Sequence, residues 1–163
     1  MFFLEEIKKV KDNYSNKIAI FVDMDGVIAD YRFGEGKNIE YNVPGTYLNK
    51  RPIKTAINIL NEVYNKFDFD MYILSSCRHA EQAIEKSKWL EKNMSFIDNK
   101  HQLFVVSDTF EDRKMLKINK IKEIMNNKYD KVIMIDDTHD ILFLAIKELG
   151  DKVIPYHVIT LFD

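Results

Sequence analysis

Short apolar runs alternate with stretches of helical periodicity along this chain. The first run, Ile18–Val22, contains only apolar residues, which is typical of a strand buried on both faces. Similar runs predict further strands over residues 71–74, 103–106, 131–135 and 153–156. Between the runs, apolar residues recur at the spacing of one helix face. This spacing predicts helices over residues 2–14, 52–64, 80–93, 116–125 and 138–149.

The alternation of strands and helices favours a parallel sheet, because consecutive parallel strands need a crossover between them. We therefore predict an α/β, Rossmann-like fold with five parallel strands flanked by helices, in one domain over residues 1–163. Residues 31–51 interrupt the alternation. They are polar and contain glycine and proline, so they predict a short lid inserted after the first strand.

Polar side chains stand at the carboxyl ends of three of the predicted strands. They are Asp23 and Asp25, Ser75 and Ser76, and Asp136 and Asp137. These strand ends share one edge of a parallel sheet, where ligands bind. Four carboxylates that converge there would repel one another, so a cation is expected, and oxygen ligands suit Mg²⁺. Because Mg²⁺ often binds together with a substrate phosphate, and hydroxyls before a helix can bind that phosphate, the pattern indicates phosphate chemistry.

Composition and charge narrow the class of protein. The 163 residues are 46% hydrophobic and 31% charged with a net charge of −2, as in an ordinary globular domain. Duplex nucleic acid is not an expected partner, because the chain has no overall positive charge. No apolar run approaches the roughly 20 residues of a membrane span. The single cysteine, Cys77, and the lack of a signal-peptide pattern favour a cytoplasmic location, and the oligomeric state stays open.

The polar motifs resemble those of the haloacid dehalogenase superfamily of phosphatases. The matching features are DxDGV at residues 23–27, a strand-end serine, a helix lysine and the acidic pair at residues 136–137. The resemblance covers most of the chain from Ile18 onward. Within the superfamily the sequence is most similar to the 5′(3′)-deoxyribonucleotidases. The motifs that carry this similarity are DMDGVIADY at residues 23–31, PGTYLNKRPI at residues 44–53 and EKSKWLEK at residues 85–92.

The resemblance implies a Mg²⁺-dependent phosphomonoesterase that works through an aspartyl-phosphate. Asp23 would be the nucleophile. Asp25 would protonate the leaving alcohol and later activate water. The implied metal ligands are Asp23, Asp136 and the backbone carbonyl of Asp25, with help from Asp137.

The resemblance also implies the residues that bind a small phosphomonoester, such as a deoxynucleotide. Ser75 would hold the phosphate with help from Ser76. Lys86 would be the lysine that neutralises the centre, and Lys88 and Lys114 are its rivals for this role. The other residues expected to bind substrate are Tyr31, which would stack on it, Arg113 and Lys114.

Two features leave the substrate open. Residues 30–44 are too few for the helical cap of the nucleotidases, and residues 136–140 read DDTHD where an arginine and a proline are expected after the acidic pair. A sugar phosphate or a phosphorylated polynucleotide end is therefore an alternative substrate. A non-catalytic phosphate-binding protein on the same scaffold is a further alternative.

Overall fold

A computed structural model describes residues 2–14, 17–31 and 43–163 as a parallel sheet with helices. The five strands lie in the order β3-β2-β1-β4-β5, all parallel, so the predicted α/β fold is confirmed. The strands are β1 (Ile18–Val22), β2 (Asp70–Cys77), β3 (Gln102–Val106), β4 (Lys131–Asp136) and β5 (Val153–His157). The helices are α1 (Phe2–Tyr14), α2 (Lys54–Phe67), α3 (Ala80–Asn93), α4 (Phe110–Met125) and α5 (His139–Leu149). None of the helices in the described ranges has the length and apolar character that a membrane crossing requires.

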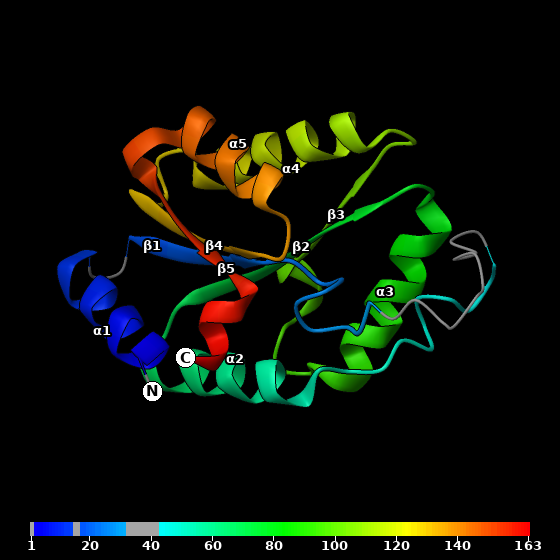
Figure 1. Cartoon of the computed structure of the whole chain (residues 1–163), viewed down its shortest axis with the longest axis horizontal. Coiled ribbons are helices and arrows are strands. Elements are labelled where there is room, and N and C mark those ends of the chain that lie inside the picture. The colour runs from blue at the N-terminus through cyan, green and yellow to red at the C-terminus, as the bar shows by residue number, and fades with distance from the viewer. Residues whose placement is uncertain (1, 15–16, 32–42) are drawn as a thin grey trace.

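Helices cover both faces of the sheet (Figure 1). α4 and α5 lie on one face, and α1, α2 and α3 lie on the other. Ile18, Ile20 and Val22 of β1 pack into the core under α1 and α2, whereas Ala19 and Phe21 belong to the core under α4 and α5. Because both faces of β1 are buried, every position of the strand is apolar.

β2 is longer than the sequence predicts. Its pairing with β3 continues through Ser75, Ser76 and Cys77, because these residues lie opposite residues 104–106. Both serines therefore belong to the strand, and neither lies in the loop that follows it. Successive strand residues point to opposite faces, so the two hydroxyls have different surroundings.

Two helices begin at other residues than the sequence predicts. α4 begins at Phe110, ahead of residue 116, because the Thr109 side chain caps it by accepting a hydrogen bond from the backbone N–H of Asp112. α2 begins at Lys54. Pro52, predicted to lie in its first turn, lies before the helix in a bridge with Ala29.

The predicted lid is described in part. Residues 43–49 form a bend and turns, and residues 32–42 lie outside the described residues. The segment from Val43 to Arg51 returns the chain from the end of β1 to the start of α2, beside the carboxyl edge of the sheet (Figure 1).

Candidate active site

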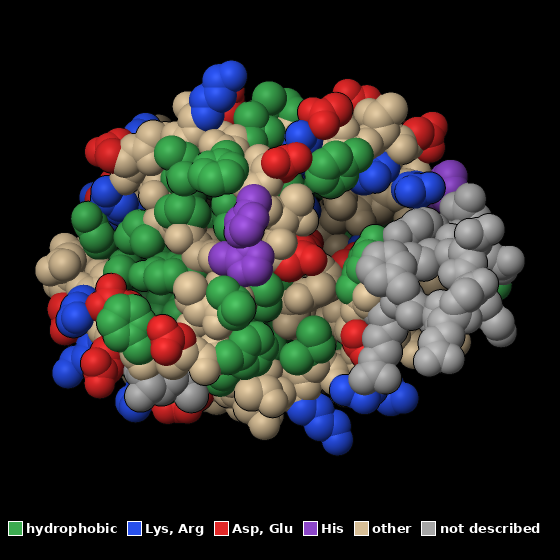
Figure 2. All heavy atoms as spheres, in the orientation of Figure 1, with side chains coloured by type: hydrophobic (Ala, Val, Ile, Leu, Met, Phe, Trp, Pro, Cys, Tyr) green, Lys and Arg blue, Asp and Glu red, His purple; other side chains and the backbone are tan. Residues whose placement is uncertain are grey.

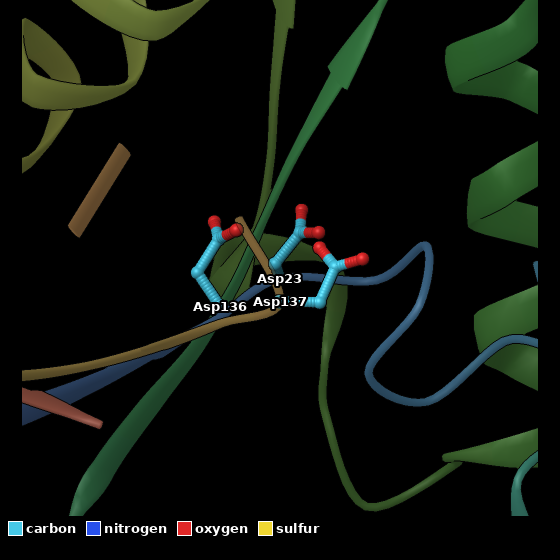
Figure 3. Close-up of side chains that lie close together, drawn as sticks. All are labelled: Asp23, Asp136 and Asp137. Atoms are coloured by element: carbon cyan, nitrogen blue, oxygen red, sulfur yellow. The ribbon is translucent and has the colours of Figure 1, made fainter. Parts of the chain in front are cut away.

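Three aspartates meet at the carboxyl edge of the sheet, where β1 and β4 end (Figure 3). Asp23, Asp136 and Asp137 each offer a carboxylate oxygen, and these oxygens lie within 4.8 Å of one another. β1 and β4 are neighbours, and the backbone N–H of Asp23 donates to the carbonyl of Ile135 at 2.9 Å. The sheet thus brings together acids that are far apart in the sequence, and it buries Asp23 and Asp136.

Gly26 makes room for one of these acids. Its φ is +84°, a backbone conformation that residues with a Cβ rarely adopt. A Cβ at this position would lie 2.1 Å from Oδ2 of Asp137. The glycine after Asp25 therefore lets the chain turn and leaves the space in which the Asp137 carboxylate lies.

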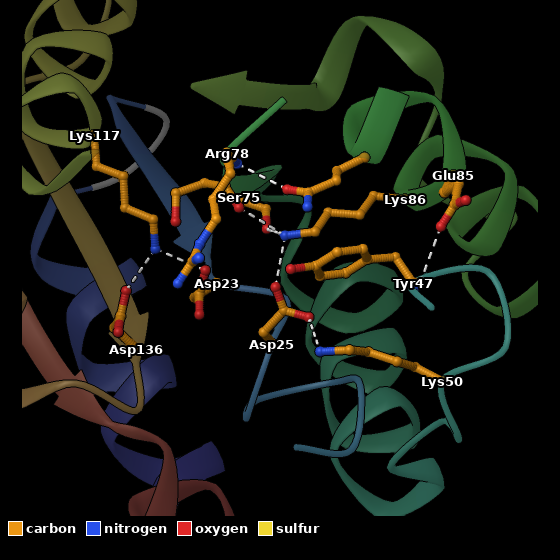
Figure 4. Close-up of polar contacts among 12 residues, drawn as sticks. Asp23, Asp25, Tyr47, Lys50, Ser75, Arg78, Glu85, Lys86, Lys117 and Asp136 are labelled. Atoms are coloured by element: carbon orange, nitrogen blue, oxygen red, sulfur yellow. Dashed lines mark hydrogen bonds and ion pairs between the residues drawn. The ribbon is translucent and has the colours of Figure 1, made fainter. Parts of the chain in front are cut away.

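Lys117 neutralises part of the negative charge of Asp23, Asp136 and Asp137, which we call the acid cluster. Its ammonium donates to Oδ1 of Asp23 at 2.6 Å and to Oδ2 of Asp136 at 2.9 Å. The Lys117 side chain is 2% exposed, and it reaches the acids from α4 (Figure 4). Lys117 and its two carboxylate partners form a buried ion-pair network. Each of these charges, buried alone, would carry a large penalty in the free energy of folding.

The sequence analysis did not single out Lys117. The predicted helix started at residue 116, so Lys117 fell at a helix end, where a lysine is usually exposed. The one available signal is its spacing: Lys117 stands next to Ile118 and four residues before Ile121, on the buried face of α4. The rival Lys88 lies on the exposed face of α3.

Asp25 has its own lysines on the opposite side of the site. Lys86 donates to Oδ2 of Asp25 at 2.6 Å, and Lys50 donates to Oδ1 at 2.6 Å (Figure 4). Lys86 is fully buried and also donates to Oγ of Ser75 and to the carbonyl of Ser76. Burial alone would raise the pKa of Asp25, but the charges of Lys86 and Lys50 outweigh burial and lower that pKa.

The acid cluster is less well neutralised than Asp25. Burial raises the pKa of Asp23 to about 7, and the Asp136 and Asp25 carboxylates add to the rise against the opposing charge of Lys117. Burial raises the pKa of Asp137 too, and Asp136 adds to this effect. Three carboxylates share one lysine here, so the cluster lacks positive charge. Carboxylate oxygens whose negative charge is only partly neutralised are suitable ligands for a hard cation such as Mg²⁺.

A pocket of about 260 Å³ opens between these two groups of charges. Figure 2 shows the surface hollowed beside the N-terminal end of α4, with hydrophobic and basic side chains at its margin. The lining residues are Asp23, Asp25, Tyr31, Tyr47, Ser76, Arg78, Phe110, Arg113, Lys117, Asp137, Thr138 and Ile141.

The pocket contains three of the four residues that were expected to bind substrate, namely Tyr31, Ser76 and Arg113. The fourth, Lys114, does not line it and pairs with Glu111 at 2.8 Å. Ser76 rather than Ser75 reaches the pocket, because Ser75 points to the other face of β2 and is fully buried beside Lys86. Tyr47 and Arg78 are lining residues that the sequence analysis did not identify.

Hydrogen bonds connect the described part of the predicted lid, residues 43–51, to α3. We call this segment the insert. The Glu85 carboxylate accepts hydrogen bonds from the backbone N–H groups of Gly45 and Tyr47 at 2.6 and 3.1 Å. The indole N–H of Trp89 donates to the carbonyl of Lys50 at 2.7 Å. These bonds connect residues 44–53 with residues 85–92. They hold the insert as a wall of the pocket.

No protein family model matches this chain, and no curated protein sequence matches it.

Several solved structures are similar to this fold, three of which are described here. A chain of the Pnkp1/Rnl/Hen1 RNA repair complex superimposes with a TM-score of 0.64 at 16% identity, over 88% of this chain and 43% of that chain. This protein thus spans less than half the length of that relative. The class C acid phosphatase from Bacillus anthracis has a TM-score of 0.63 at 16% identity, over 98% of this chain and 78% of the phosphatase.

The third relative is a protein from Burkholderia xenovorans LB400 that is named as a haloacid dehalogenase-like hydrolase. Its TM-score is 0.56 at 14% identity, over 86% of this chain and 81% of the hydrolase. At these identities the likeness shows the fold. The chain has the fold of the haloacid dehalogenase-like hydrolases.

Proposed function

We propose that this protein is a Mg²⁺-dependent phosphomonoesterase that forms an aspartyl-phosphate on Asp23. One observation carries the proposal. Asp23 lines the pocket as a member of the acid cluster and accepts a hydrogen bond from Lys117, and Asp25 lines the same pocket beside its own pair of lysines. The fold, shared with an acid phosphatase and a haloacid dehalogenase-like hydrolase, supports this assignment.

The residues present fit a bound Mg²⁺. Asp23 and Asp136 would hold it together with the backbone carbonyl of Asp25, and Asp137 would assist. When bound, the cation supplies positive charge to the carboxylates and to the phosphate oxygens. Lys117 adds a fixed positive charge beside Asp23, which opposes the effect of burial and favours the ionised form of the nucleophile.

In the first chemical step, a carboxylate oxygen of Asp23 forms a bond to phosphorus as the bond from phosphorus to the leaving oxygen breaks. Asp25, once it has taken up a proton against the two lysines that lower its pKa, gives this proton to the leaving oxygen, which departs as an alcohol. In the second step, Asp25 takes a proton from water, and the water oxygen attacks phosphorus. The bond from phosphorus to Asp23 breaks, which releases inorganic phosphate and restores the free carboxylate.

The pocket suggests how the substrate is held. Ser76 lines the pocket and is placed to contact the phosphate, whereas Ser75 acts through Lys86. Tyr31 and Phe110 are 40% and 43% exposed at the pocket, so each offers part of an aromatic ring to a flat group. We propose that this group is a base and that the substrate is a deoxyribonucleoside monophosphate.

Turnover on a substrate panel tests this function. The panel contains nitrophenyl phosphate, deoxynucleoside 5′- and 3′-monophosphates, ribonucleotides, sugar phosphates and phosphorylated oligonucleotide ends. We expect phosphate release with Mg²⁺, a preference for deoxynucleoside monophosphates and loss of turnover when EDTA removes the metal. A preference for sugar phosphates or oligonucleotide ends would refute the nucleotidase assignment. Binding of phosphate with Mg²⁺ but no turnover on any compound would indicate a non-catalytic phosphate-binding protein.

A further inference from the structure

Both carboxylate oxygens of Asp25 are paired with a lysine. Lys86 takes Oδ2 and Lys50 takes Oδ1, each at 2.6 Å. A group that protonates a leaving oxygen must bring one of its own oxygens within hydrogen-bond distance of it. If Asp25 has the role proposed above, release of one lysine when substrate binds would clear one of these oxygens for the leaving group.

Lys86 is the lysine that stays. Its ammonium has three N–H donors, and all three have acceptors: Asp25, the Ser75 hydroxyl and the Ser76 carbonyl. The Lys86 side chain is 0% exposed. Moving it would break three hydrogen bonds of a buried ammonium at once, and a buried donor is costly to leave unpaired.

Lys50 is the lysine that can move. Within the described residues, its ammonium has Asp25 as its single hydrogen-bond acceptor. The rings of Tyr31 and Tyr47 also lie beside it, with centroids 4.8 and 4.9 Å from Nζ. Aromatic faces attract an ammonium without fixing its direction, so it can slide along them. All three groups around this ammonium, Asp25 and the two tyrosines, also line the pocket.

The backbone of Lys50 is fixed, although its side chain is only loosely held. Its carbonyl accepts the indole N–H of Trp89, and its own N–H donates to the carbonyl of Tyr47 at 3.4 Å. The backbone of Lys50 therefore holds its place while the long side chain can change conformation, next to the place where a phosphate dianion would bind.

We propose that Lys50 is a substrate-contacting residue that moves from Asp25 to a phosphate oxygen of the bound substrate. In the free protein it occupies Oδ1 of Asp25. A phosphate in the pocket draws the ammonium away, which frees that oxygen for the leaving group. The inference rests on the proposed function, and it assigns a role in phosphate recognition to a residue of the insert.

The test compares steady-state constants of Lys50→Met, Lys50→Arg and Lys54→Met. Lys54 is an exposed lysine at the start of α2 and controls for the loss of one nearby charge. We expect Lys50→Met to raise KM, and the inhibition constant of inorganic phosphate, by about 10-fold or more, since a charge-assisted hydrogen bond to phosphate is lost. Its kcat should stay within about threefold of the original value, because the lost contact is made in ground and transition states alike. Lys50→Arg should restore most of the affinity, and Lys54→Met should change neither constant.

Other results would overturn the proposal. A lower kcat at unchanged KM would mean that Lys50 only orients Asp25. Unchanged constants would refute the contact with substrate, and a lower melting temperature beside them would mean that Lys50 only stabilises the insert. If the original protein turns over no substrate, the proposed function fails. Calorimetry with inorganic phosphate and Mg²⁺ then still tests the contact, and equal affinities of the original protein and Lys50→Met would refute it.

Discussion

Replacement of Asp23 by Asn is expected to lower phosphate release by at least about 10³-fold, because an amide oxygen is a poor nucleophile and the covalent route is lost. Asn has almost the same shape as Asp, so it fits the buried position beside Lys117. The fold should therefore survive, which circular dichroism and thermal unfolding will show. The measurement is turnover of nitrophenyl phosphate with saturating Mg²⁺.

A matched control for this variant is Asp108→Asn. Asp108 is exposed, follows β3 at the same edge of the sheet, and does not line the pocket. We expect its turnover to equal that of the original protein. Mg²⁺-dependent turnover that persists undiminished in Asp23→Asn would exclude Asp23 as the nucleophile.

The second large effect is expected for Lys117→Met, in the stability of the fold. Methionine has a similar length but no charge, so Asp23 and Asp136 lose their shared buried partner. Leaving buried charges without a partner costs about 3–5 kcal/mol in the free energy of unfolding. Added Mg²⁺ should recover part of this loss, because the cation binds the same carboxylates only in the folded protein. Chemical denaturation with and without Mg²⁺ measures both effects.

Lys114→Met is the control for this variant, on the same helix. Lys114 pairs with Glu111, whose side chain is 79% exposed, so its loss should cost no more than about 1 kcal/mol. Equal stabilities of the two variants, or no effect of Mg²⁺ on Lys117→Met, would show that Lys117 does not neutralise a metal-binding acid cluster.

The apolar pattern predicted much of the fold, because a parallel strand buried on both faces has no polar position. Ile18–Val22 shows this directly. Asp23 and Asp136 could likewise be placed together before the structure was known, since each follows an apolar run and such runs end at one edge of the sheet. The ends of helices were harder to predict. The cap at Thr109 starts α4 early, and the residues it adds to the helix carry no apolar stripe.

The lysines of the site were the main omission. Lys117 is buried only because two carboxylates from other parts of the chain surround its ammonium, and such a tertiary contact leaves no local trace beyond helical spacing. The position of Lys50 likewise could not be predicted from its sequence neighbours. It depends on the hydrogen bond from the Trp89 indole and on the rings of Tyr31 and Tyr47. Lys86 was found by the resemblance of its motif. The structure places it beside Asp25, which leaves the neutralisation of Asp23 to Lys117.

The most direct test of the mechanism is to trap the covalent intermediate. The Asp25→Asn variant lacks the base of the second step, so it should accumulate the phosphorylated form when mixed with nitrophenyl phosphate and Mg²⁺. The reaction is quenched with acid, and the phosphoryl group is located by peptide mass spectrometry. We expect one phosphoryl group on Asp23 and none when Asp23 is also changed to Asn. An unmodified Asp23 in a protein that releases phosphate, or a phosphoryl group on another residue, would contradict the aspartyl-phosphate mechanism.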